Sequence, residues 1–479
     1  MDQACTPVFD GLLQYHNRQA FSFHVPGHKD GLIFPEKAAP YFRPLLALDA
    51  TEVAGLDDLY HPEGIIRAGE ALLTQYYQSR ASLFLVNGST VGNLIMVQAA
   101  CHEGDTVLVQ RDSHKSVFHA LRLGRVRPVF LAPFRDRKSG LTAGVDPRAW
   151  KEALRKYPQA KAVILTYPNY YGMAPDIAGL IREAHAHGMT VLVDEAHGAH
   201  FHLGHPLPPS ALDLGADLVV HSAHKMLPAM TMGAWLHVCS QRVSTESVRE
   251  AREALQTSSP SYPIMASLDL ARYVLANLDR LRVDHILECR NRFVRGLEKI
   301  GKVHVLKADP GYYRVDPFKI TLDAGPGVNG YDWQKRLIES GIYPEMADSE
   351  HVLLTLGLTD RIPLDAALTG IRESLEELHP FHRRKDPEPV RFQLCSTLAG
   401  TYSELSKTEK QDTALNLAEG QVAAEYVIPY PPGIPVIIKG ERITRAQREL
   451  VERLVREGTV FQNDGITKGK IKIYKAGVL

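Results

Sequence analysis

The sequence has no long hydrophobic run and no excess of either charge. Its 479 residues include 55 basic side chains (Lys and Arg) and 55 acidic side chains (Asp and Glu), so the formal net charge is zero. A neutral chain offers no global electrostatic attraction to nucleic acid or to an anionic membrane. No apolar stretch approaches the roughly 18 residues that a membrane-spanning helix needs. The composition therefore favours a soluble globular protein with a small-molecule partner.

Cysteine is also scarce. The five cysteines, at positions 5, 101, 239, 289 and 395, form no CxxC pair and no even-numbered framework. Secreted domains stabilised by disulfides use cysteines in even sets. The first residues, MDQAC, lack the basic start and apolar core of a signal peptide. Together these features predict a reduced protein in the cytoplasm.

The chain has no internal repeat, so its organisation must be inferred from alternating strand-like and helix-like patterns. These alternate between about residues 80 and 240. Short apolar runs predict strands, and the amphipathic segments between them predict helices. This alternation is typical of a mostly parallel sheet covered by helices. The predicted strands are 82–86, 106–109, 162–166, 190–193, 217–220 and 234–238, and the predicted helices are 90–100, 116–123, 147–157 and 177–188, the last two capped by Asp146 and Asp176.

The regions on either side have different patterns. The first residues are rich in proline and predict an irregular arm. The charged stretch 382–387 is typical of a solvated linker. Beyond the large domain, the predicted elements are strands near 312–321 and 351–356 and helices near 331–340 and 364–378. The predicted parts are an N-terminal arm (1–60), a large domain (61–305), a small α+β domain (306–381) and a C-terminal domain (382–479).

Polar residues follow three of the predicted strands, where parallel sheets bind their ligands. The segment 87–90 opens a helix with glycine, serine and threonine, a pattern that can cradle a phosphate. Asp194 comes directly after a buried apolar strand. Lys225 follows a later strand and has Ser222 and His224 as neighbours. A buried lysine loses its charge and becomes nucleophilic, as a Schiff-base lysine requires.

Each pattern has a simpler interpretation when it stands alone. A serine or threonine before a helix is most often an N-cap, an aspartate can cap a turn, and a loop lysine usually faces solvent. Their combination is more specific, because a phosphate, a cationic ring nitrogen and an aldehyde are what these groups would bind. One further excursion and one strand separate Asp194 from Lys225, so both can reach the same sheet edge. The combination predicts pyridoxal 5'-phosphate as the cofactor.

Eight ordered motifs make the sequence resemble one known family. It is similar to the bacterial pyridoxal-phosphate-dependent ornithine/lysine/arginine decarboxylases, in the short form without the N-terminal receiver-like domain. The resemblance covers nearly the whole chain. The motifs are PGHKDG (26–31), TEVAGLDDL with HPEG (51–59 and 61–64), NGST (87–90), DSHKS (112–116), DEAHGAH (194–200), SAHK (222–225), TSSPSY (257–262) and PYPPGIP (429–435).

This resemblance implies PLP fold type I, which is aspartate-aminotransferase-like, and a homodimer or higher homo-oligomer with active sites at subunit interfaces. It also implies roles by matching positions. Lys225 matches the lysine that binds the cofactor covalently, Asp194 the acid paired with the pyridine nitrogen, and His114 the imidazole stacked on the ring. The phosphate-binding positions are matched by Ser89, Thr90, Ser222 and His224, and His197 is placed near the phenolic oxygen of the cofactor.

Two features of the sequence bear on the substrate pocket and on metal binding. Asn169 stands in PNYYG (168–172), where the family pattern has threonine, and this changes the polar character of a strand end. The histidines at 197, 200, 202 and 205 are spaced closely enough for a zinc site, but no cysteine or carboxylate set completes one. We therefore predict no metal.

The predicted reaction is the decarboxylation of a basic L-amino acid, and the resemblance to short forms favours L-arginine, giving agmatine for polyamine biosynthesis. Lysine and ornithine are the alternative substrates. An aminotransferase, an aldolase and a non-catalytic polyamine regulator are alternatives of other classes on the same fold. His114 and the segment 430–435 favour the decarboxylase. The carboxylates available for a cationic substrate side chain are Asp57, Asp58, Glu345 and Glu425, each of which can instead be a surface or capping residue.

Overall fold

The chain divides into two compact units in the computed structural model. The described residues are 1–325, 327–376, 378 and 392–475. The first unit contains residues 1–101 and 177–279, and the second contains the described part of 102–176 and 280–479. The charged stretch 382–387 lies outside the described residues, and the four predicted domains stay a prediction.

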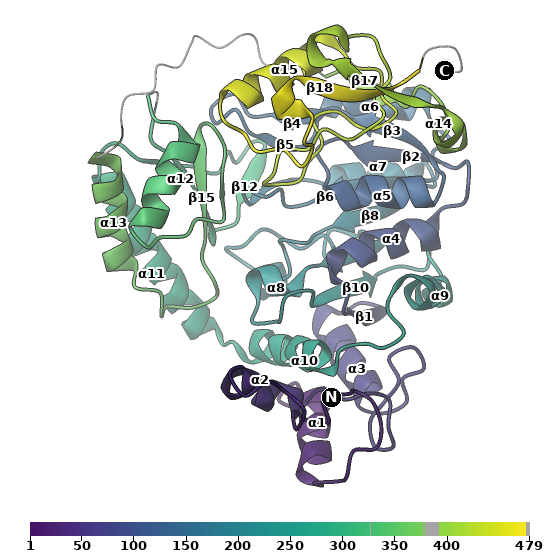
Figure 1. Ribbon diagram of the computed structural model, residues 1–479, viewed down its shortest axis with the longest axis vertical. Coiled ribbons are helices and arrows are strands. Elements are labelled where there is room, and N and C mark those ends of the chain that lie inside the picture. Colours follow the sequence, from purple (N-terminus) through teal and green to yellow (C-terminus); the bar gives the residue numbers. More distant parts are fainter. Residues whose placement is uncertain (326, 377, 379–391, 476–479) are drawn as a thin grey trace. The chain divides into compact units, whose positions relative to one another are not determined.

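Four strands form the sheet of the first unit, in the order β1-β10-β9-β8 (Figure 1). The β1–β10 and β10–β9 pairs are antiparallel, and the β9–β8 pair is parallel. The elements of this unit are α1 (Pro7–Asn17), α2 (Ala39–Leu46), α3 (Ile65–Tyr77), β1 (Ala81–Leu85), α4 (Gly88–Ala100), α7 (Ala178–Ala186), β8 (Thr190–Asp194), η1 (Phe201–Leu203), β9 (Leu218–His221), α8 (Ala223–Met226), β10 (Ala234–Val238), α9 (Thr245–Leu255) and α10 (Tyr262–Asn277).

Strand direction brings the predicted ligand-binding ends to one edge. Because two successive antiparallel pairs restore the original direction, β1 runs the same way as β9 and β8. Every residue of β8, β9 and β10 is buried, as expected for short apolar strands covered on both faces. The carboxyl ends of β1, β8 and β9 therefore lie at the same edge of this sheet.

Helix α4 packs unusually close to that sheet. A Cβ atom on Gly92 would lie 2.3 Å from Cγ2 of Val220 on β9. Any larger residue would push the helix away from the strand, so glycine is required here by the close approach. This packing keeps the start of α4 beside the carboxyl ends of the strands.

The predicted irregular arm is wrong in part, because residues 1–60 contain α1 and α2. Each of these helices has a proline in its first two positions. A proline there costs nothing, since the N–H group that it lacks would have no partner within the helix. Pro7 and Pro40 therefore mark helix starts rather than a lack of structure, while Pro44 lies within α2. Residues 25–29, which overlap the PGHKDG motif, lie outside both helices.

Four strands in the order β6-β2-β3-β16 form the larger sheet of the second unit. Strand β2 is parallel to β3 and β6, and β16 is antiparallel to β3. The elements of this unit are β2 (Thr106–Gln110), α5 (Lys115–Leu123), β3 (Arg127–Leu131), β4 (Pro133–Arg135), β5 (Thr142–Val145), α6 (Pro147–Lys156), β6 (Ala162–Thr166), β7 (Met173–Pro175), α11 (Arg280–Lys299), β11 (His304–Val305), β12 (Tyr313–Val315), β13 (Lys319–Asp323), α12 (Gly330–Glu339), β14 (Met346–Ala347), β15 (His351–Thr355), α13 (Leu364–Glu376), β16 (Cys395–Thr397), α14 (Tyr402–Lys407), β17 (Lys410–Ala414), η2 (Leu415–Leu417), α15 (Arg445–Arg456), η3 (Ile466–Lys468) and β18 (Lys470–Tyr474).

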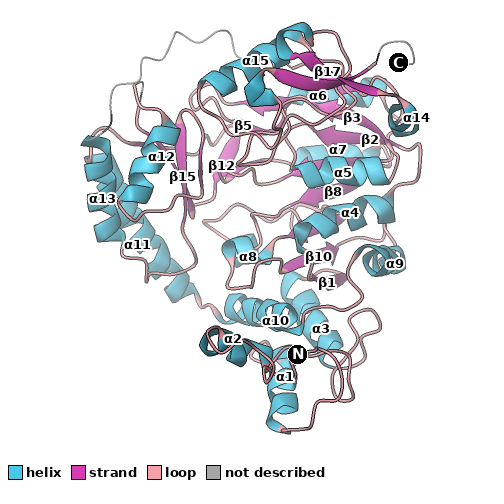
Figure 2. Ribbon diagram, viewed as in Figure 1, coloured by secondary structure: helices cyan, strands magenta, loops and turns pink. Residues whose placement is uncertain are grey.

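A smaller antiparallel sheet, β11-β13-β15-β14, forms within the second unit, and α12 packs against β15 and α13 (Figure 2). The segment near 312–321 forms two strands instead of one. Strand β12 pairs with β7, whereas β13 pairs with β11 and β15. Between them, Asp316 Oδ1 accepts from the Phe318 N–H at 3.0 Å, and this local turn redirects the chain.

Most other predicted elements of the alternating region are confirmed to within about two residues, the usual uncertainty of an element's ends. Helix α7 is an exception at its start, because its N-cap is Ile177 rather than Asp176. All five cysteines are free thiols. Among the described residues, no helix is long and apolar enough to cross a membrane, and no group of three or more potential metal ligands is found.

Asp57 caps α3 from a distance in the sequence. Its carboxylate accepts hydrogen bonds from the N–H groups of Gly64, Ile66 and Arg67 at 2.9–3.2 Å and also from Glu63. Three of these groups belong to the first turn or the residue before it, where a helix has no internal acceptors. This candidate substrate carboxylate is therefore a capping residue.

We expect Asp57→Ala to lower the free energy of unfolding by about 2 kcal/mol, because the start of α3 loses its acceptor. The measurement is the midpoint of thermal unfolding by calorimetry. Asp58→Ala is the matched control, since Asp58 accepts from only the Tyr60 N–H among the backbone contacts described. Equal midpoints for the two variants would contradict the capping role.

Candidate active site

The acid and the lysine selected from the sequence lie at the carboxyl ends of β8 and β9. Asp194 is the last residue of β8, and Lys225 lies in α8, which follows β9. Asp194 is buried, and its Oδ2 atom accepts a hydrogen bond from Asn93 Nδ2 at 2.9 Å. Its Oδ1 atom accepts from the Ala196 N–H at 3.2 Å. The carboxylate is thus held by α4 and by its own turn.

Burial dominates the electrostatics of Asp194. Loss of water raises the pKa of Asp194 above its usual value, while the Lys225 charge, the Asn93 amide and the Ala196 N–H oppose this. A cationic ring nitrogen beside the carboxylate would favour its ionised form in the same way as Lys225 does. The site therefore fits a cofactor whose ring carries a positive charge.

Lys225 and His197 are within hydrogen-bond distance of each other. Lys225 Nζ lies 3.1 Å from His197 Nε2. His197 is buried, and Lys225 is half-buried. At this distance a proton can pass between the amine and the imidazole. The structure therefore brings together Asp194, His197 and Lys225, and it gives His197 a second possible role beside the lysine.

Glu195 fastens the turn after β8. It is fully buried and accepts hydrogen bonds from Ser210 Oγ at 2.7 Å and from the Ala211 N–H at 2.9 Å. Its Oε2 atom lies 2.8 Å from His221 Nε2 at the end of β9. Burial raises the pKa of Glu195 well above its usual value and lowers the pKa of His221 to about 3, so this imidazole is neutral. These contacts hold the turn that begins at Asp194 against β9.

A line of buried polar side chains continues from His221 across the sheet. His221 Nδ1 lies 3.0 Å from His237 Nε2 on β10, and His237 Nδ1 lies 2.7 Å from Ser82 Oγ on β1. Burial lowers the pKa of both imidazoles, so each is neutral and can donate one hydrogen bond and accept another. The line pairs polar atoms that would otherwise destabilise the interior.

The start of α4 carries the predicted phosphate-binding residues Ser89 and Thr90. The N-cap residue, Asn87, makes no side-chain capping bond, and its Oδ1 atom instead accepts from the Thr257 N–H at 3.2 Å. The Gly88 N–H, the first of α4, donates to the Met232 carbonyl at 2.8 Å, so an acceptor at this helix end would use the N–H groups of Ser89 and Thr90. An anion suits this position, because these N–H groups and the helix dipole both favour negative charge.

Ser222 and His224, the other predicted phosphate-binding residues, lie at the start of α8. Ser222 Oγ is 3.4 Å from His224 Nδ1, and His224 Nδ1 is 3.2 Å from the Gly233 carbonyl. The neighbouring Met232 carbonyl accepts from the Gly88 N–H at 2.8 Å. One short segment thus contacts both α8 and the start of α4, which supports a shared phosphate site.

His114 belongs to the second unit, where it is the N-cap of α5. Its Nδ1 atom accepts from the Ser116 N–H at 3.3 Å and lies 2.8 Å from Ser116 Oγ. The Lys115 N–H donates to the Gly433 carbonyl at 3.2 Å. A Cβ atom on Gly433 would lie 3.4 Å from His114 Cδ2. The structure therefore places His114 against the proline-rich C-terminal motif, far away in the sequence.

A buried ion pair joins the same two segments. Arg111 directly follows β2 and donates through both Nη atoms to both carboxylate oxygens of Glu441. Arg111 Nη2 also donates to the Val436 carbonyl at 3.0 Å. Both charged side chains are buried, and breaking such a pair leaves an uncompensated charge. The pair therefore fixes the C-terminal segment against the loop that carries His114.

Glu425 is also committed to structural contacts. It accepts from Asn463 Nδ2 at 2.9 Å and from the Lys472 N–H at 2.7 Å. Of the carboxylates suggested for a cationic substrate, Glu425 and Asp57 are therefore accounted for by the fold.

Sequence reasoning did not select Asn93 or Glu195. Asn93 carried a usable signal, because it is a polar residue within the apolar helix segment 91–97, and such residues are buried only with a partner. Glu195 follows Asp194 directly and gave no signal of its own. Its partners, Ser210 and His221, are identified only by the tertiary structure.

The chain matches two family models. The model described as Orn/Lys/Arg decarboxylase, major domain, matches residues 6–362, and the model described as Orn/Lys/Arg decarboxylase, C-terminal domain, matches residues 390–460. An uncharacterized protein of Bacillus subtilis, YaaO, is 43% identical and covers 97% of both chains. The arginine decarboxylase of Bacillus subtilis is 32% identical and covers 93% of this chain and 92% of its own.

A solved structure, lysine decarboxylase A from Pseudomonas aeruginosa, has a TM-score of 0.82 at 20% sequence identity. The similarity covers 98% of this chain and 80% of that chain. The predicted fold class, PLP fold type I with a mostly parallel sheet, is confirmed. The cofactor that the residues fit, pyridoxal phosphate, agrees with the family models.

We expect Asn93→Ala to raise the pKa of Asp194 further, because the amide no longer stabilises the ionised form. A protonated carboxyl pairs poorly with a cationic ring nitrogen, so turnover should fall by about ten-fold for each unit of pKa. The loss should grow as the pH falls. The measurement is kcat against pH, with Asn17→Ala at the exposed end of α1 as the control. A kcat loss independent of pH would contradict this explanation.

Proposed function

The chain belongs to the Orn/Lys/Arg decarboxylase family and is a pyridoxal-phosphate-dependent amino-acid decarboxylase, and from this premise we propose that it converts L-arginine to agmatine and carbon dioxide. The observation that carries the substrate is the 32% identity with the arginine decarboxylase of Bacillus subtilis over at least 92% of both chains. A cytoplasmic location and a place in polyamine biosynthesis belong to the same proposal.

In the proposed mechanism, the first unit supplies the groups that hold the cofactor. Pyridoxal phosphate provides an electron sink for the electron pair that the departing carboxylate leaves on Cα. Asp194 keeps a proton on the ring nitrogen by charge pairing. Asn93 keeps that carboxylate in position through Oδ2. Ser89, Thr90, Ser222 and His224, at the starts of α4 and α8, would hold the phosphate of the cofactor.

Lys225 and His197 move protons. Lys225 Nζ is nucleophilic only when uncharged, and His197 Nε2, 3.1 Å away, can take the proton that the ammonium must lose. After the bond from Cα to the carboxylate breaks, Cα needs one proton in place of carbon dioxide. Lys225 or His197 returns that proton, which completes the amine product.

We assign His114 the role of holding the plane of the cofactor ring. The hydrogen bonds of its Nδ1 atom to Ser116 restrict rotation of the imidazole. Gly433 has no side chain to displace it, and the Arg111–Glu441 pair fixes the surrounding loop. The second unit thus supports a preorganised imidazole.

We expect purified, cofactor-loaded protein to release carbon dioxide and agmatine from L-arginine, and to do so faster than it acts on L-lysine or L-ornithine. Lys225→Ala should reduce the rate by at least about a thousand-fold, because both the nucleophile and a proton donor are lost. Lys299→Ala, an exposed lysine at the end of α11, is the control and should keep full activity.

The outcomes separate the alternatives. Cadaverine or putrescine as the main product would replace arginine with lysine or ornithine. Amino-group transfer to a keto acid without carbon dioxide release would contradict the decarboxylase reaction. Protein that neither reacts nor binds the cofactor through Lys225 would favour the non-catalytic regulator.

We also propose that the protein is a homo-oligomer. Large apolar side chains are exposed along the N-terminal region of the first unit, each between 67% and 95% exposed. Exposed apolar side chains concentrated in one segment of the chain suit a protein interface. A second copy of the chain is the partner that the proposal assigns to it. The residues are Phe21, Phe23, Val25, Leu32, Ile33 and Tyr41.

The double variant Phe21→Ser, Phe23→Ser should shift the sedimentation coefficient towards that of a monomer at low protein concentration, because the interface loses two aromatic anchors. The matched control is Leu417→Ser, an exposed apolar residue of η2 in the second unit. A wild-type protein that sediments as a monomer would contradict the proposal, as would an unchanged oligomer in the double variant.

A further inference from the structure

A buried line of hydrogen-bonded side chains crosses the sheet of the first unit and ends at Glu195, beside the candidate active site. From Glu195 it passes through His221 on β9 and His237 on β10 to Ser82 on β1, with paired atoms 2.7–3.0 Å apart. Glu195 and both histidines are 0% exposed, and Ser82 is 1% exposed. Strand register explains the far half of the line, because Ser82 lies directly opposite His237. The proposed mechanism uses none of these four side chains.

The position of one proton sets the direction of these hydrogen bonds. Burial lowers the pKa of His221 and of His237, so each imidazole is neutral and donates on one side while it accepts on the other. If Glu195 is a carboxylate, His221 donates to it, and every bond in the line points towards Glu195. If Glu195 is a carboxylic acid, it donates to His221, and every bond points towards Ser82. Ser82 Oγ suits both directions, because Ser79 Oγ lies 2.7 Å away.

The surroundings of Glu195 favour the carboxylic acid. Its other hydrogen-bond donors, Ser210 Oγ at 2.7 Å and the Ala211 N–H at 2.9 Å, are neutral groups. Burial raises the pKa of Glu195 well above its usual value. Asp213 adds to this shift, whereas the two hydrogen bonds and His200 oppose it. The remaining titratable side chains near Glu195 are those of Tyr77, Asp194, His221 and Cys239.

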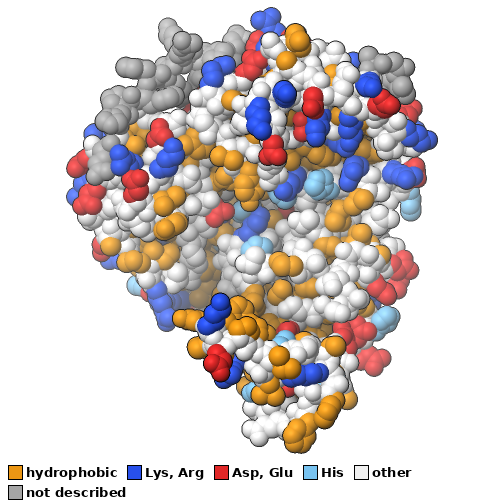
Figure 3. All heavy atoms as spheres, viewed as in Figure 1, with side chains coloured by type: hydrophobic (Ala, Val, Ile, Leu, Met, Phe, Trp, Pro, Cys, Tyr) orange, Lys and Arg blue, Asp and Glu red, His pale blue; other side chains and the backbone are white. Residues whose placement is uncertain are grey.

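A second buried glutamate of the same unit shows what an ionised side chain requires. Glu70 on α3 forms an ion pair with Arg252, with Oε1 and Nη1 2.7 Å apart, and the arginine offsets the cost of burying the carboxylate. At the surface, water offsets that cost for charged side chains such as those on the face shown in Figure 3. Among the described residues, Glu195 has neither an arginine nor a lysine as a hydrogen-bond partner, and it has no exposed surface.

A charge on Glu195 would also oppose the charge on Asp194, the preceding residue. Two carboxylates in one buried site raise each other's pKa, so their environments separate them into a neutral group and an ionised group. Asp194 has the Asn93 amide and the charge of Lys225 to favour its ionised form. The neutral group of the two is therefore Glu195.

We propose that Glu195 is a positioning residue that works as a neutral carboxylic acid. It donates to His221, and the hydrogen bonds continue through His237 to Ser82. The turn after β8 is thereby fastened to β9, β10 and β1 without a second negative charge beside Asp194. The benefit to the cofactor rests on the proposed function, because it assumes that Asp194 pairs with the ring nitrogen. The protonation of Glu195 does not rest on it.

The direct test is the infrared difference spectrum between the cofactor-loaded wild type and its Glu195→Gln variant at neutral pH. We expect the wild type to show the carbonyl band of a protonated carboxylic acid, which the variant lacks. Glu70→Gln is the matched control, because its difference spectrum should show the carboxylate bands of the ionised partner of Arg252. Carboxylate bands for Glu195 as well would overturn the proposal, whether or not the protein decarboxylates arginine.

The positioning role is tested by the rate at which the loaded protein loses pyridoxal phosphate during dialysis, followed by the absorbance of the bound cofactor. Glu195→Leu should speed this loss by about ten-fold or more, because Ser210 and His221 lose their partner. Glu195→Gln should restore most of the difference, since its amide can donate to both and still accept from the Ala211 N–H. Equal losses from the two variants would overturn the role.

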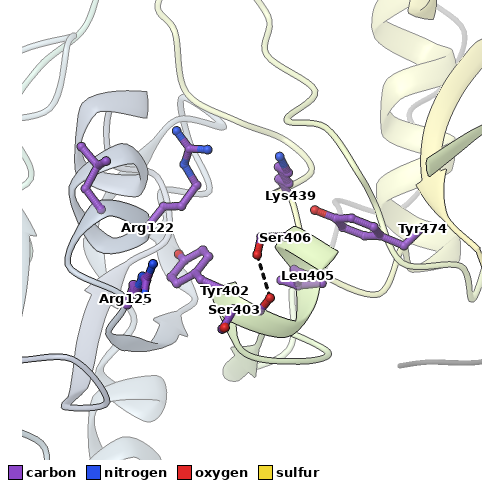
Figure 4. A pocket seen from close by; sticks show the side chains of 9 residues that line it. Arg122, Arg125, Tyr402, Ser403, Leu405, Ser406, Lys439 and Tyr474 are labelled. Carbon is purple, nitrogen blue, oxygen red and sulfur yellow. Dashed lines mark hydrogen bonds between the residues drawn. The ribbon is translucent and has the colours of Figure 1, made fainter. Parts of the chain in front are cut away.

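The far end of the line gives an independent check. Ser82→Ala removes the acceptor of His237 and should also speed the loss of cofactor, by a smaller factor than Glu195→Leu does. The control is Ser406→Ala, which should behave as the wild type does. Ser406 Oγ donates to the Ser403 carbonyl at 2.7 Å in the wall of a cavity that Arg122 and Lys439 also line (Figure 4).

Thermal unfolding of each variant, measured in parallel, separates a local effect on the cofactor from a loss of folding. Cofactor loss from Ser82→Ala at the rate of the wild type would overturn the extension of the line to β1. Neither the infrared spectrum nor the dialysis uses a substrate, so a failure of the proposed reaction is distinguished from a failure of this proposal.

Discussion

The candidate active site depends on two adjacent carboxylates, Asp194 and Glu195, that are buried at the end of β8. Burial is costly for both, and the fold offsets the cost differently for each. Glu195 accepts hydrogen bonds from Ser210 and Ala211 and lies 2.8 Å from His221 Nε2 on β9, so it fixes the turn in place. Asp194 accepts a hydrogen bond from Asn93 of α4, and the charge of Lys225 favours its ionised form. A further cation near Asp194 would have the same effect. Glu195 thus stabilises the turn, and Asp194 is the carboxylate that the proposal assigns to the cofactor.

This division explains why a lysine and an acid can work at one sheet edge. The charge of Lys225 favours the ionised form of Asp194. In the proposed mechanism, however, the lysine must give up that charge to act as a nucleophile. His197 beside the amine provides a place for that proton. In the proposed mechanism, Asp194 would then pair with the protonated ring nitrogen of pyridoxal phosphate.

The second unit shows how a distant segment can hold His114, a residue that the proposal assigns to the cofactor ring. His114 is the N-cap residue of α5, and Arg122 lies in the last turn of this helix. The C-terminal part of the chain contacts both ends: Gly433 packs against the imidazole, and Lys439 lines the same cavity as Arg122. A short, rigid helix about 14 Å long joins these two places. The buried Arg111–Glu441 pair anchors the C-terminal segment. Packing of this segment therefore affects the surroundings of both His114 and Arg122.

The sequence by itself determined the alternating strands and helices, the cofactor and the family, because apolar periodicity and strand-end motifs are local properties. It placed Asp194, Lys225 and the start of α4 at the same edge, which follows from strand order. It did not predict the N-terminal helices α1 and α2. A proline usually indicates the end of a helix, and only its position in the first turn makes it compatible with one. Only the tertiary structure paired Asn93 with Asp194 and brought Gly433 to His114. Contacts between residues far apart in the chain are set by packing, and no local pattern records them.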